Sequence, residues 1–406
     1  MAESVLERRL DNWTVWLAAI VPVGLAVGTV AFEAIVVAAD LCWMATLLIR
    51  RHLPDFLRSR STPAMALLLW LASVWLSRFV SPNAGLHAWV HDLAFSRHII
   101  FVMALIDIAH RRPVARYLAW GLVTGVAWSA INTVLALTVG YDLVGHPAWR
   151  YTGKLKENAR IAAICAYAGP MLAFWSRQVF NRQRRKGAWL AFFAVVSFVL
   201  LLKSVIRTAI IGSFAGSLFG CLFFVRKNAQ LLLKVAAVLC CLILAVGYLA
   251  SVKGVYLGSL YLRAYIWKVS FAIWKENPFF GVGISSFKSA YDIIYGSGAV
   301  SPFVAPDGLA YNLAKPFHAH NLALQLLACT GLFGFLAFGW LFIKLCRLAF
   351  ADNNPWGPGL ATWPVVFLVI GLAGWNIFDA FYATIFSYLA ALTATGAVAP
   401  TEPAPG

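Results

Sequence analysis

Three short passages of the chain hold residue types that can bind a diphosphate and move a proton. They are residues 203–208 (KSVIRT), 263–268 (RAYIWK) and 318–321 (HAHN). An arginine guanidinium stays charged and grips phosphate oxygens in pairs, while a neutral histidine can take a proton near pH 7. A base and a diphosphate clamp are the minimum needed to transfer a group from a lipid diphosphate to a hydroxyl. A metal-dependent transferase would want a carboxylate pair such as Asp-x-Asp, and the predicted outer connections contain none.

Each passage also has a structural explanation that residue types alone leave open. Lys203 and Arg207 lie four residues apart at the end of a predicted span, where cations snorkel to the interface. His320 opens a predicted helix, where a histidine is often a cap or a structural residue. His318, two residues earlier, either orients a substrate or caps the same helix.

The composition shows which elements must position these residues. Of the 406 residues, 61% are hydrophobic and only 12% are charged, against about 25% charged in soluble domains. Lipid must solvate much of that apolar surface, and the alternating pattern of a β-barrel is absent. We therefore predict an all-α integral membrane protein with about twelve spans. The predicted spans are 14–30, 32–49, 63–80, 89–108, 117–139, 160–179, 188–206, 208–225, 231–250, 330–348, 361–376 and 380–396.

The distribution of basic residues predicts how the chain is oriented. With a cytoplasmic N-terminus, every inner connection is short and basic, as the positive-inside rule requires. Both termini are then cytoplasmic. We predict four parts: spans 1–9 in residues 1–250, a large outer segment at 251–319 carrying part of the active site, spans 10–12 in 320–397, and a disordered tail at 398–406.

Cations on the predicted outer side gather in three places, at 150–160, 203–207 and 253–315. Positive charge on the translocated side opposes the insertion bias, and an anionic ligand is the simplest reason for keeping it. Solvated loops and snorkelling side chains are the alternative.

The third passage resembles a pattern of the bacterial O-antigen ligase family. His320-Asn321 is followed after nine residues by Gly331-Leu-Phe-Gly334, which fits H[NSQ]x9Gxx[GTY]. The arginine passages resemble the wider O-antigen ligase/polymerase superfamily in the same order. Arg207 stands where that superfamily has an arginine preceded by serine, although here Ile206 replaces the serine.

Two further stretches extend the resemblance. Arg263 and Trp267, followed by NPFFGVG at 277–283, resemble the superfamily's R…W…NPxxGxG stretch. RYTG at 150–153, with Asn158, is a looser match to its RxxG…N passage.

The resemblance implies a GT-C-like glycosyltransferase of the bacterial inner membrane with a periplasmic active site. Such enzymes transfer O-antigen polysaccharide from undecaprenyl diphosphate to a hydroxyl of the lipid A–core, amid membrane lipids and without metal, cofactor or nucleic acid. By match, His320 would be the general base, and Arg207 and Arg263 would stabilise the departing diphosphate. Neighbouring side chains would bind substrate, namely Arg150, Lys154, Arg160, Lys203, Trp267, Lys268 and His318.

Three other functions fit parts of the pattern. An O-antigen polymerase would share the donor but use a second lipid-linked glycan as acceptor. A protein O-oligosaccharyltransferase of the same superfamily is usually a longer chain. A transporter for an anionic lipid would show internal repeats and interrupted helices at the bilayer midplane, but no repeat is evident and the polar candidates gather at the outer edge.

Overall fold

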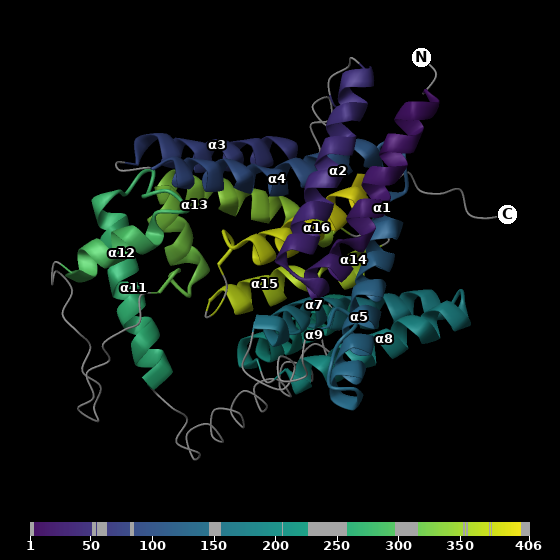
Figure 1. Cartoon of the computed structure of the whole chain (residues 1–406). Coiled ribbons are helices and arrows are strands. Elements are labelled where there is room, and N and C mark those ends of the chain that lie inside the picture. The colour runs from purple at the N-terminus through teal and green to yellow at the C-terminus, as the bar shows by residue number, and fades with distance from the viewer. Residues whose placement is uncertain are drawn as a thin grey trace.

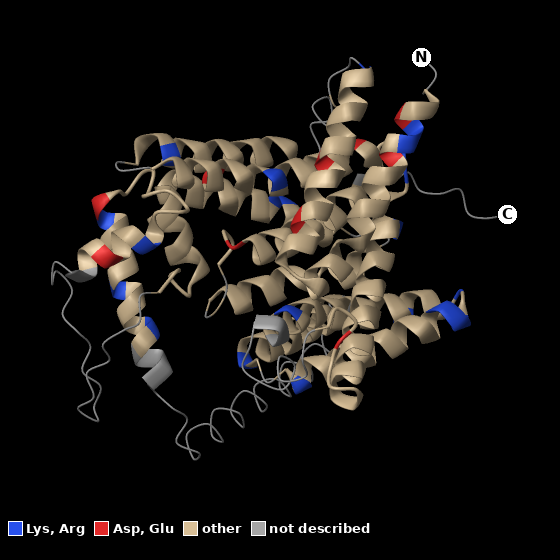
Figure 2. Ribbon diagram, viewed as in Figure 1, with Lys and Arg blue, Asp and Glu red and all other residues tan. Residues whose placement is uncertain are grey.

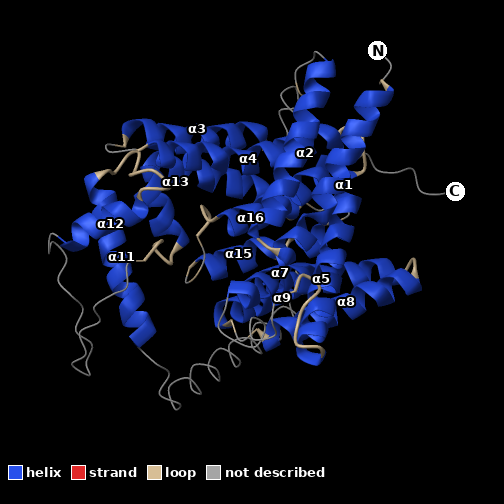
Figure 3. Cartoon of the chain, in the orientation of Figure 1, coloured by secondary structure: helices blue, strands red, loops and turns tan. Residues whose placement is uncertain are grey.

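The computed structural model of the chain describes residues 4–50, 54, 63–81, 85–145, 156–204, 206–225, 258–296, 316–351, 354, 356–372, 374 and 376–398. Within these residues every regular element is a helix and none is a strand (Figure 3), which confirms the all-α prediction there. The helices are α1 (Val5–Val27), α2 (Thr29–Arg50), α3 (Ala64–Val80), α4 (Leu86–Ala109), α5 (Val114–Thr138), α7 (Lys156–Phe180), α8 (Arg184–Lys203), α9 (Arg207–Val225), α11 (Gly258–Glu276), α12 (Phe287–Gly296), α13 (Leu322–Ala349), α14 (Gly357–Leu360), α15 (Trp363–Gly371) and α16 (Ala380–Val398).

Six of the described helices are long and apolar enough to cross a membrane: α1, α2, α5, α8, α13 and residues 380–397 of α16. Shorter apolar helices occur in α3, in α9 and in the α14–α15 stretch. A chain with six such helices is a multi-pass membrane protein. Each predicted span except 231–250 falls on a helix, and 231–250 lies outside the described residues. The count of twelve therefore stays a prediction.

α1 begins well before the predicted span because its first turn is capped. Ser4 Oγ accepts a hydrogen bond from the Glu7 backbone N–H at 3.1 Å. Serine followed three residues later by glutamate is the capping-box pattern. The added turns bring Glu7 and Asp11 to the ends of α2 and α4.

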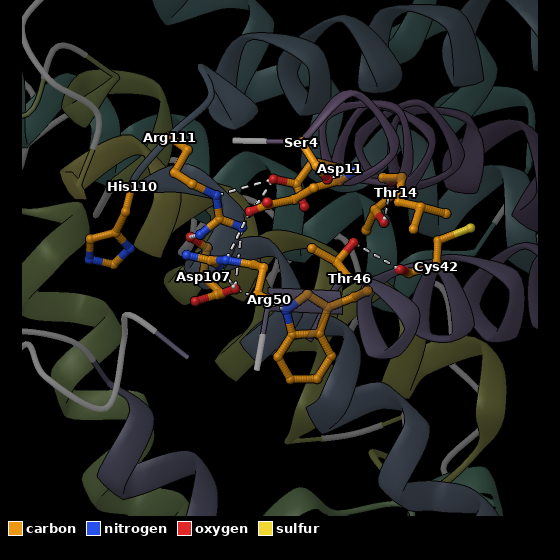
Figure 4. A network of polar contacts seen from close by, with 12 residues as sticks. Ser4, Asp11, Thr14, Cys42, Thr46, Arg50, Asp107, His110 and Arg111 are labelled. Carbon is orange, nitrogen blue, oxygen red and sulfur yellow. Dashed lines mark hydrogen bonds and ion pairs between the residues drawn. The ribbon is translucent and has the colours of Figure 1, made fainter. Parts of the chain in front are cut away.

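An ion-pair network joins the start of α1 to the ends of α2 and α4 (Figure 4). Arg50 Nε lies 2.9 Å from a Glu7 carboxylate oxygen, and Arg111 Nη2 lies 3.0 Å from Asp11. Both arginines also approach the fully buried Asp107, at 3.5 and 3.4 Å. We call this group of five residues the terminal network, because it lies near the N-terminus of the chain.

The core where α3, α13, α15 and α16 meet is aromatic. The buried Trp70 ring contacts Phe338 and Phe386 at centroid distances of 5.2 and 5.9 Å. Phe367 packs on Phe386 at 5.1 Å, and the buried Trp363 indole donates to Thr393 Oγ1 at 2.9 Å. Edge-to-face ring contacts are favourable beyond their buried area. They give α13 a rigid support along its later turns.

α11 and α12 lie beside one end of α13, away from both chain termini (Figure 1). We call this the α11 end of the molecule. α12 is amphipathic, with Phe287, Tyr291 and Ile294 buried and Lys288 paired to Asp292 at 2.8 Å. Figure 2 shows charged residues along both helices. Within the predicted outer segment 251–319, the structure describes helix at 258–276 and 287–296.

Candidate active site

The turn before α13 holds His320 in an unusual backbone conformation. Its φ is 51°, and among the described residues it is the one non-glycine residue with positive φ. Such a conformation costs about 1–3 kcal/mol. Gln325 Oε1 accepts from the Ala319 backbone N–H at 2.6 Å, and Asn321 Oδ1 caps α13 by accepting from Leu324 N–H at 3.1 Å. These bonds fix the backbone from which the His320 side chain extends.

The imidazoles of His318 and His320 lie side by side. Their ring centroids are 4.0 Å apart, with planes at 49°, and the Gly374 backbone lies near enough to both rings to act on their pKa. Burial, followed by the charges of His318 and Arg263, lowers the pKa of His320 to about 4. Burial also lowers the pKa of His318. Both rings are therefore neutral at pH 7 and able to accept a proton.

Arg263 approaches the histidines from α11, which packs against α13. Its side chain is half-buried, and that burial lowers its pKa, although an arginine keeps its charge at neutral pH. Trp267 follows one helical turn later, and its indole Nε1 is buried without a hydrogen-bond partner among the described residues. The pair offers a cation and an indole N–H on one side of α11.

Arg207 opens α9 close to the same place. Thr208, the next residue, lies against Gly374, where an added Cβ would be 3.5 Å from Thr208 Oγ1. The Arg207 side chain is exposed and makes no hydrogen bond or ion pair with the described residues. The N-terminus of a helix favours anions. Gly374 therefore links the start of α9 to the histidine pair, although no described contact joins Arg207 to His320.

The remaining predicted substrate-binding residues lie further away or outside the described residues. Lys203 is exposed at the end of α8, and Lys268 is exposed on α11 beside Trp267. Arg160 Nη2 donates to Thr29 Oγ1 at 2.6 Å, and its guanidinium lies 5.9 Å from the Phe381 ring centroid. Arg150 and Lys154 lie outside the described residues. For all five, substrate binding stays a prediction.

α13 is two helices joined at a break that the sequence did not indicate. Gly331 has φ 65° and ψ −167°, which is not helical. The freed carbonyls of Ala328 and Cys329 accept from Val282 and Gly283 N–H at 3.0 and 2.9 Å. On the other side of the break, Leu332 and Phe333 N–H donate to the carbonyls of Pro278 and Phe279 at 2.8 and 3.1 Å. Residues 278–283 thus replace the helical bonds that the break removes.

The glycines of the two sequence patterns are explained by this joint. A Cβ at Gly331 would lie 2.2 Å from the Phe279 carbonyl carbon, and one at Gly281 would lie 2.4 Å from that of Cys329. Both glycines also have positive φ. The NPFFGVG stretch and the Gly331 position therefore form a single backbone contact between the end of α11 and α13.

The comparison with protein families agrees with these features. The model of the O-antigen ligase family matches residues 186–339. This part of the chain is similar to O-antigen ligases. The O-antigen ligase match includes Arg207, Arg263, His320 and the joint at Gly331, and it supports the O-antigen ligase/polymerase superfamily, whose members are glycosyltransferase-like enzymes. No curated protein sequence matches the chain.

Proposed function

We propose that this protein is an O-antigen ligase. It would take O-antigen polysaccharide from undecaprenyl diphosphate and join it to a hydroxyl of the lipid A–core at the periplasmic face of the inner membrane. The observation that carries the proposal is the meeting of a strained, neutral His320 with Arg263 and the start of α9, within an O-antigen ligase-like part of the chain.

The proposed reaction is a direct displacement. His320 accepts the proton of the acceptor hydroxyl as its oxygen bonds to the anomeric carbon of the donor. The bond from that carbon to the diphosphate breaks, and the configuration inverts. Arg207 and Arg263 balance the charge that grows on the leaving diphosphate, which is where preorganised donors contribute most. Two arginines then supply the positive charge that other transferases take from a metal.

The environment of His320 suits this role in one further respect. In the free protein burial is the main cause of the lowered pKa of His320, and the charges of His318 and Arg263 add to it. A bound diphosphate would neutralise part of the Arg263 charge and raise the pKa toward the physiological range. His320 would thus become a better base when the donor is in place.

The proposal includes the predicted frame of about twelve spans, cytoplasmic termini and a periplasmic α11 end. The break in α13 is the kind of interrupted helix that the transport alternative predicts. Its backbone groups at Ala328, Cys329, Leu332 and Phe333 are already paired with residues 278–283. They are not open to a transported ion, so the break supports a fixed scaffold for a transferase.

A reconstituted assay tests the proposal. Purified protein is mixed with lipid-linked O-antigen and rough lipopolysaccharide, with and without a metal chelator. A ladder on the lipopolysaccharide, insensitive to the chelator, is the expected result. Longer chains on the lipid carrier would assign the chain to the polymerases instead, and no glycan transfer to either acceptor would refute a transferase.

A histidine control sharpens the assay. His87, at the start of α4, is exposed. His87→Ala is expected to ligate like the wild type, whereas His320→Ala is expected to be inactive. Equal activity in the two variants would remove His320 from the reaction.

A further inference from the structure

Arg78 is a fully buried arginine that contacts residues 282–286, next to the break in α13, and Asp92 of α4. It lies in the last turn of α3 and has 1% of its surface exposed. Its guanidinium pairs with the buried Asp92 of α4 at 3.6 Å. It also donates to the Val282 carbonyl at 3.2 Å, to Ser285 Oγ at 3.2 Å and to Ser286 Oγ at 3.0 Å.

Two serines of α3 continue the same attachment. Ser81 Oγ donates to the Val282 carbonyl at 2.7 Å, and Ser77 Oγ donates to the Cys329 carbonyl. The Arg78 guanidinium also fills the space where a side chain at Gly283 would stand. Segment 282–286 is therefore held on one side by α3 and α4 and bonded on the other side to the break in α13.

This segment stands between the two elements that carry the proposed chemistry. α11, with Arg263, runs directly into residues 278–283. The first half of α13 starts after His320 and ends at the break. Residues 278–283 stabilise this break by bonding to the backbone on both sides of it. Any movement of the segment changes the angle between the two elements.

We propose that Arg78, paired with Asp92, is a positioning residue for the transferase: it fixes the angle at the α13 break and thereby sets His320 against Arg263. The inference rests on the proposed function, because it assigns a purpose to that geometry. Burying an ion pair is costly unless its hydrogen bonds are satisfied. Here the hydrogen bonds of the guanidinium all go to residues 282–286, while the Asp92 oxygens have no hydrogen-bond partner among the described residues and compensate the charge through the ion pair.

Simple geometry shows how sensitive the site is to this angle. Residues 322–330 span about 14 Å at 1.5 Å per residue. A tilt of about 5° at Gly331 would therefore move His320 by about 1 Å. A displacement of about 1 Å of a catalytic group can cost on the order of 100-fold in rate.

The test uses Arg78→Lys, which keeps the charge beside Asp92 but cannot reach three acceptors at once. Hydrogen exchange is measured by mass spectrometry on peptides covering 278–286 and 328–335. Ligation is measured on the same samples as kcat, KM and the pH profile of kcat/KM. We expect exchange at the joint to rise about 10-fold or more, and kcat to fall about 10- to 100-fold with KM nearly unchanged.

The pH profile separates positioning from simple destabilisation. Among the described residues, the groups that act on His320 are His318 in its own turn, Arg263 on α11 and the Gly374 backbone. If the joint loosens, Arg263 moves away and its lowering effect weakens. The acid limb of the Arg78→Lys profile is then expected to move to higher pH.

Two further variants keep the test decisive. Arg97→Lys changes another arginine, whose side chain is largely buried and pairs with Glu33 at 2.9 Å. No described contact joins Arg97 to residues 282–286. This variant is expected to leave exchange at the joint and kcat unchanged. Ser285→Ala with Ser286→Ala removes two of the Arg78 acceptors with little change in volume, and it replaces Arg78→Lys if that variant does not fold.

The possible results separate the positioning role of Arg78 from the proposed function of the protein. Unchanged exchange at the joint would overturn the proposal, and so would raised exchange with wild-type kcat and pH profile. Raised exchange in a protein whose wild type transfers glycan to neither acceptor would refute the proposed function while confirming that Arg78 holds the joint.

Discussion

His320 combines a strained backbone with a buried, neutral imidazole. A histidine needed only as a cap would not require positive φ, because Asn321 already caps α13. Strain of this kind persists where the surroundings determine it, which is common at reactive sites. At the residue scale, the unusual backbone and the shared Gly374 contact support the base assignment beyond the motif alone.

Substitution by asparagine separates the chemistry of His320 from its backbone. Asparagine tolerates the left-handed conformation better than most residues but cannot serve as a base. His320→Asn is therefore expected to lower kcat by about 10²- to 10⁴-fold without lowering the unfolding temperature. Ligation assays and thermal unfolding in the same detergent check both parts. Near-normal ligation by this variant would show that another group takes the proton.

The lowered pKa of His320 predicts an acid limb far below that of ordinary histidine. A base works when deprotonated, so activity should be present above its pKa and lost as pH falls through it. With a pKa of about 4, kcat/KM should stay flat between pH 7 and about 5 and fall below that. His318→Ala removes a nearby charge that lowers this pKa, so its acid limb should lie at higher pH. Identical profiles would mean that His318 does not act on the base.

Arg207 is expected to matter for turnover and not for folding. It makes no hydrogen bond or ion pair with the described residues, so Arg207→Ala should leave the unfolding temperature unchanged. Loss of one preorganised charge should lower kcat by about 10²- to 10³-fold. Arg184→Ala, at the opposite end of α8, is the matched control and should ligate normally.

At the element scale, α13 works as two short helices on a common joint. Its later turns are fixed in the aromatic core through Phe338, while its first half carries the turn with His320 at its start. The NPFFGVG stretch supplies backbone groups where the helix lacks them. The joint therefore gives one membrane helix a second direction, and the turn with His320, the proposed base, stands at the start of its first half.

Two glycines of α13 give a matched test of the joint. Gly331→Ala would place a Cβ 2.2 Å from the Phe279 backbone at φ 65°, and it should cost about 2–4 kcal/mol or prevent folding. Gly339, in the second half, has open space where its Cβ would stand. Gly339→Ala should be neutral or stabilise by about 0.5–1 kcal/mol. Thermal unfolding of the two variants distinguishes them, and equal stability would contradict the role of the break.

At the scale of the whole molecule, two groups of polar contacts among the described residues stand out in an apolar scaffold. The terminal network ties α1, α2 and α4 together (Figure 4). The helices α11 and α12, beside one end of α13, lie away from the chain termini (Figure 1), and Arg263 belongs to α11 while Arg78 bonds to the segment that joins α11 to α12. The first group stabilises the scaffold, and the second is where we expect chemistry.

Breaking the terminal network should therefore affect stability alone. Arg111→Ala leaves the fully buried Asp11 and Asp107 without a shared partner, which should cost about 3–5 kcal/mol. Ligation per folded molecule should stay close to the wild-type value, because the site is distant. Arg116→Ala, an exposed neighbour, should change neither quantity. A loss of kcat in folded Arg111→Ala would show coupling between the two groups.

The sequence was informative where chemistry depends on side-chain type and uninformative where it depends on backbone contacts. His320, Arg207 and Arg263 were predicted from spacing and resemblance, and the all-helical class followed from composition. Gly374 acts through its backbone, so no pattern in side chains points to it. Arg78 is 204 residues away from Val282 in the sequence, and there it is only a cation at the end of a predicted span. The NPFFGVG glycines and Gly331 were each visible in a sequence pattern, but the contact between them was not.

The break in α13 has a consequence for how the protein is made. In lipid, each unpaired backbone group costs several kcal/mol, so α13 should enter the bilayer as one continuous helix. It can bend only after residues 278–283 dock and supply the missing bonds. Because the bend is proposed to set the base His320, that site would be completed last, after insertion and packing. A newly inserted chain would therefore be inert toward its lipid-linked substrates until it is fully assembled.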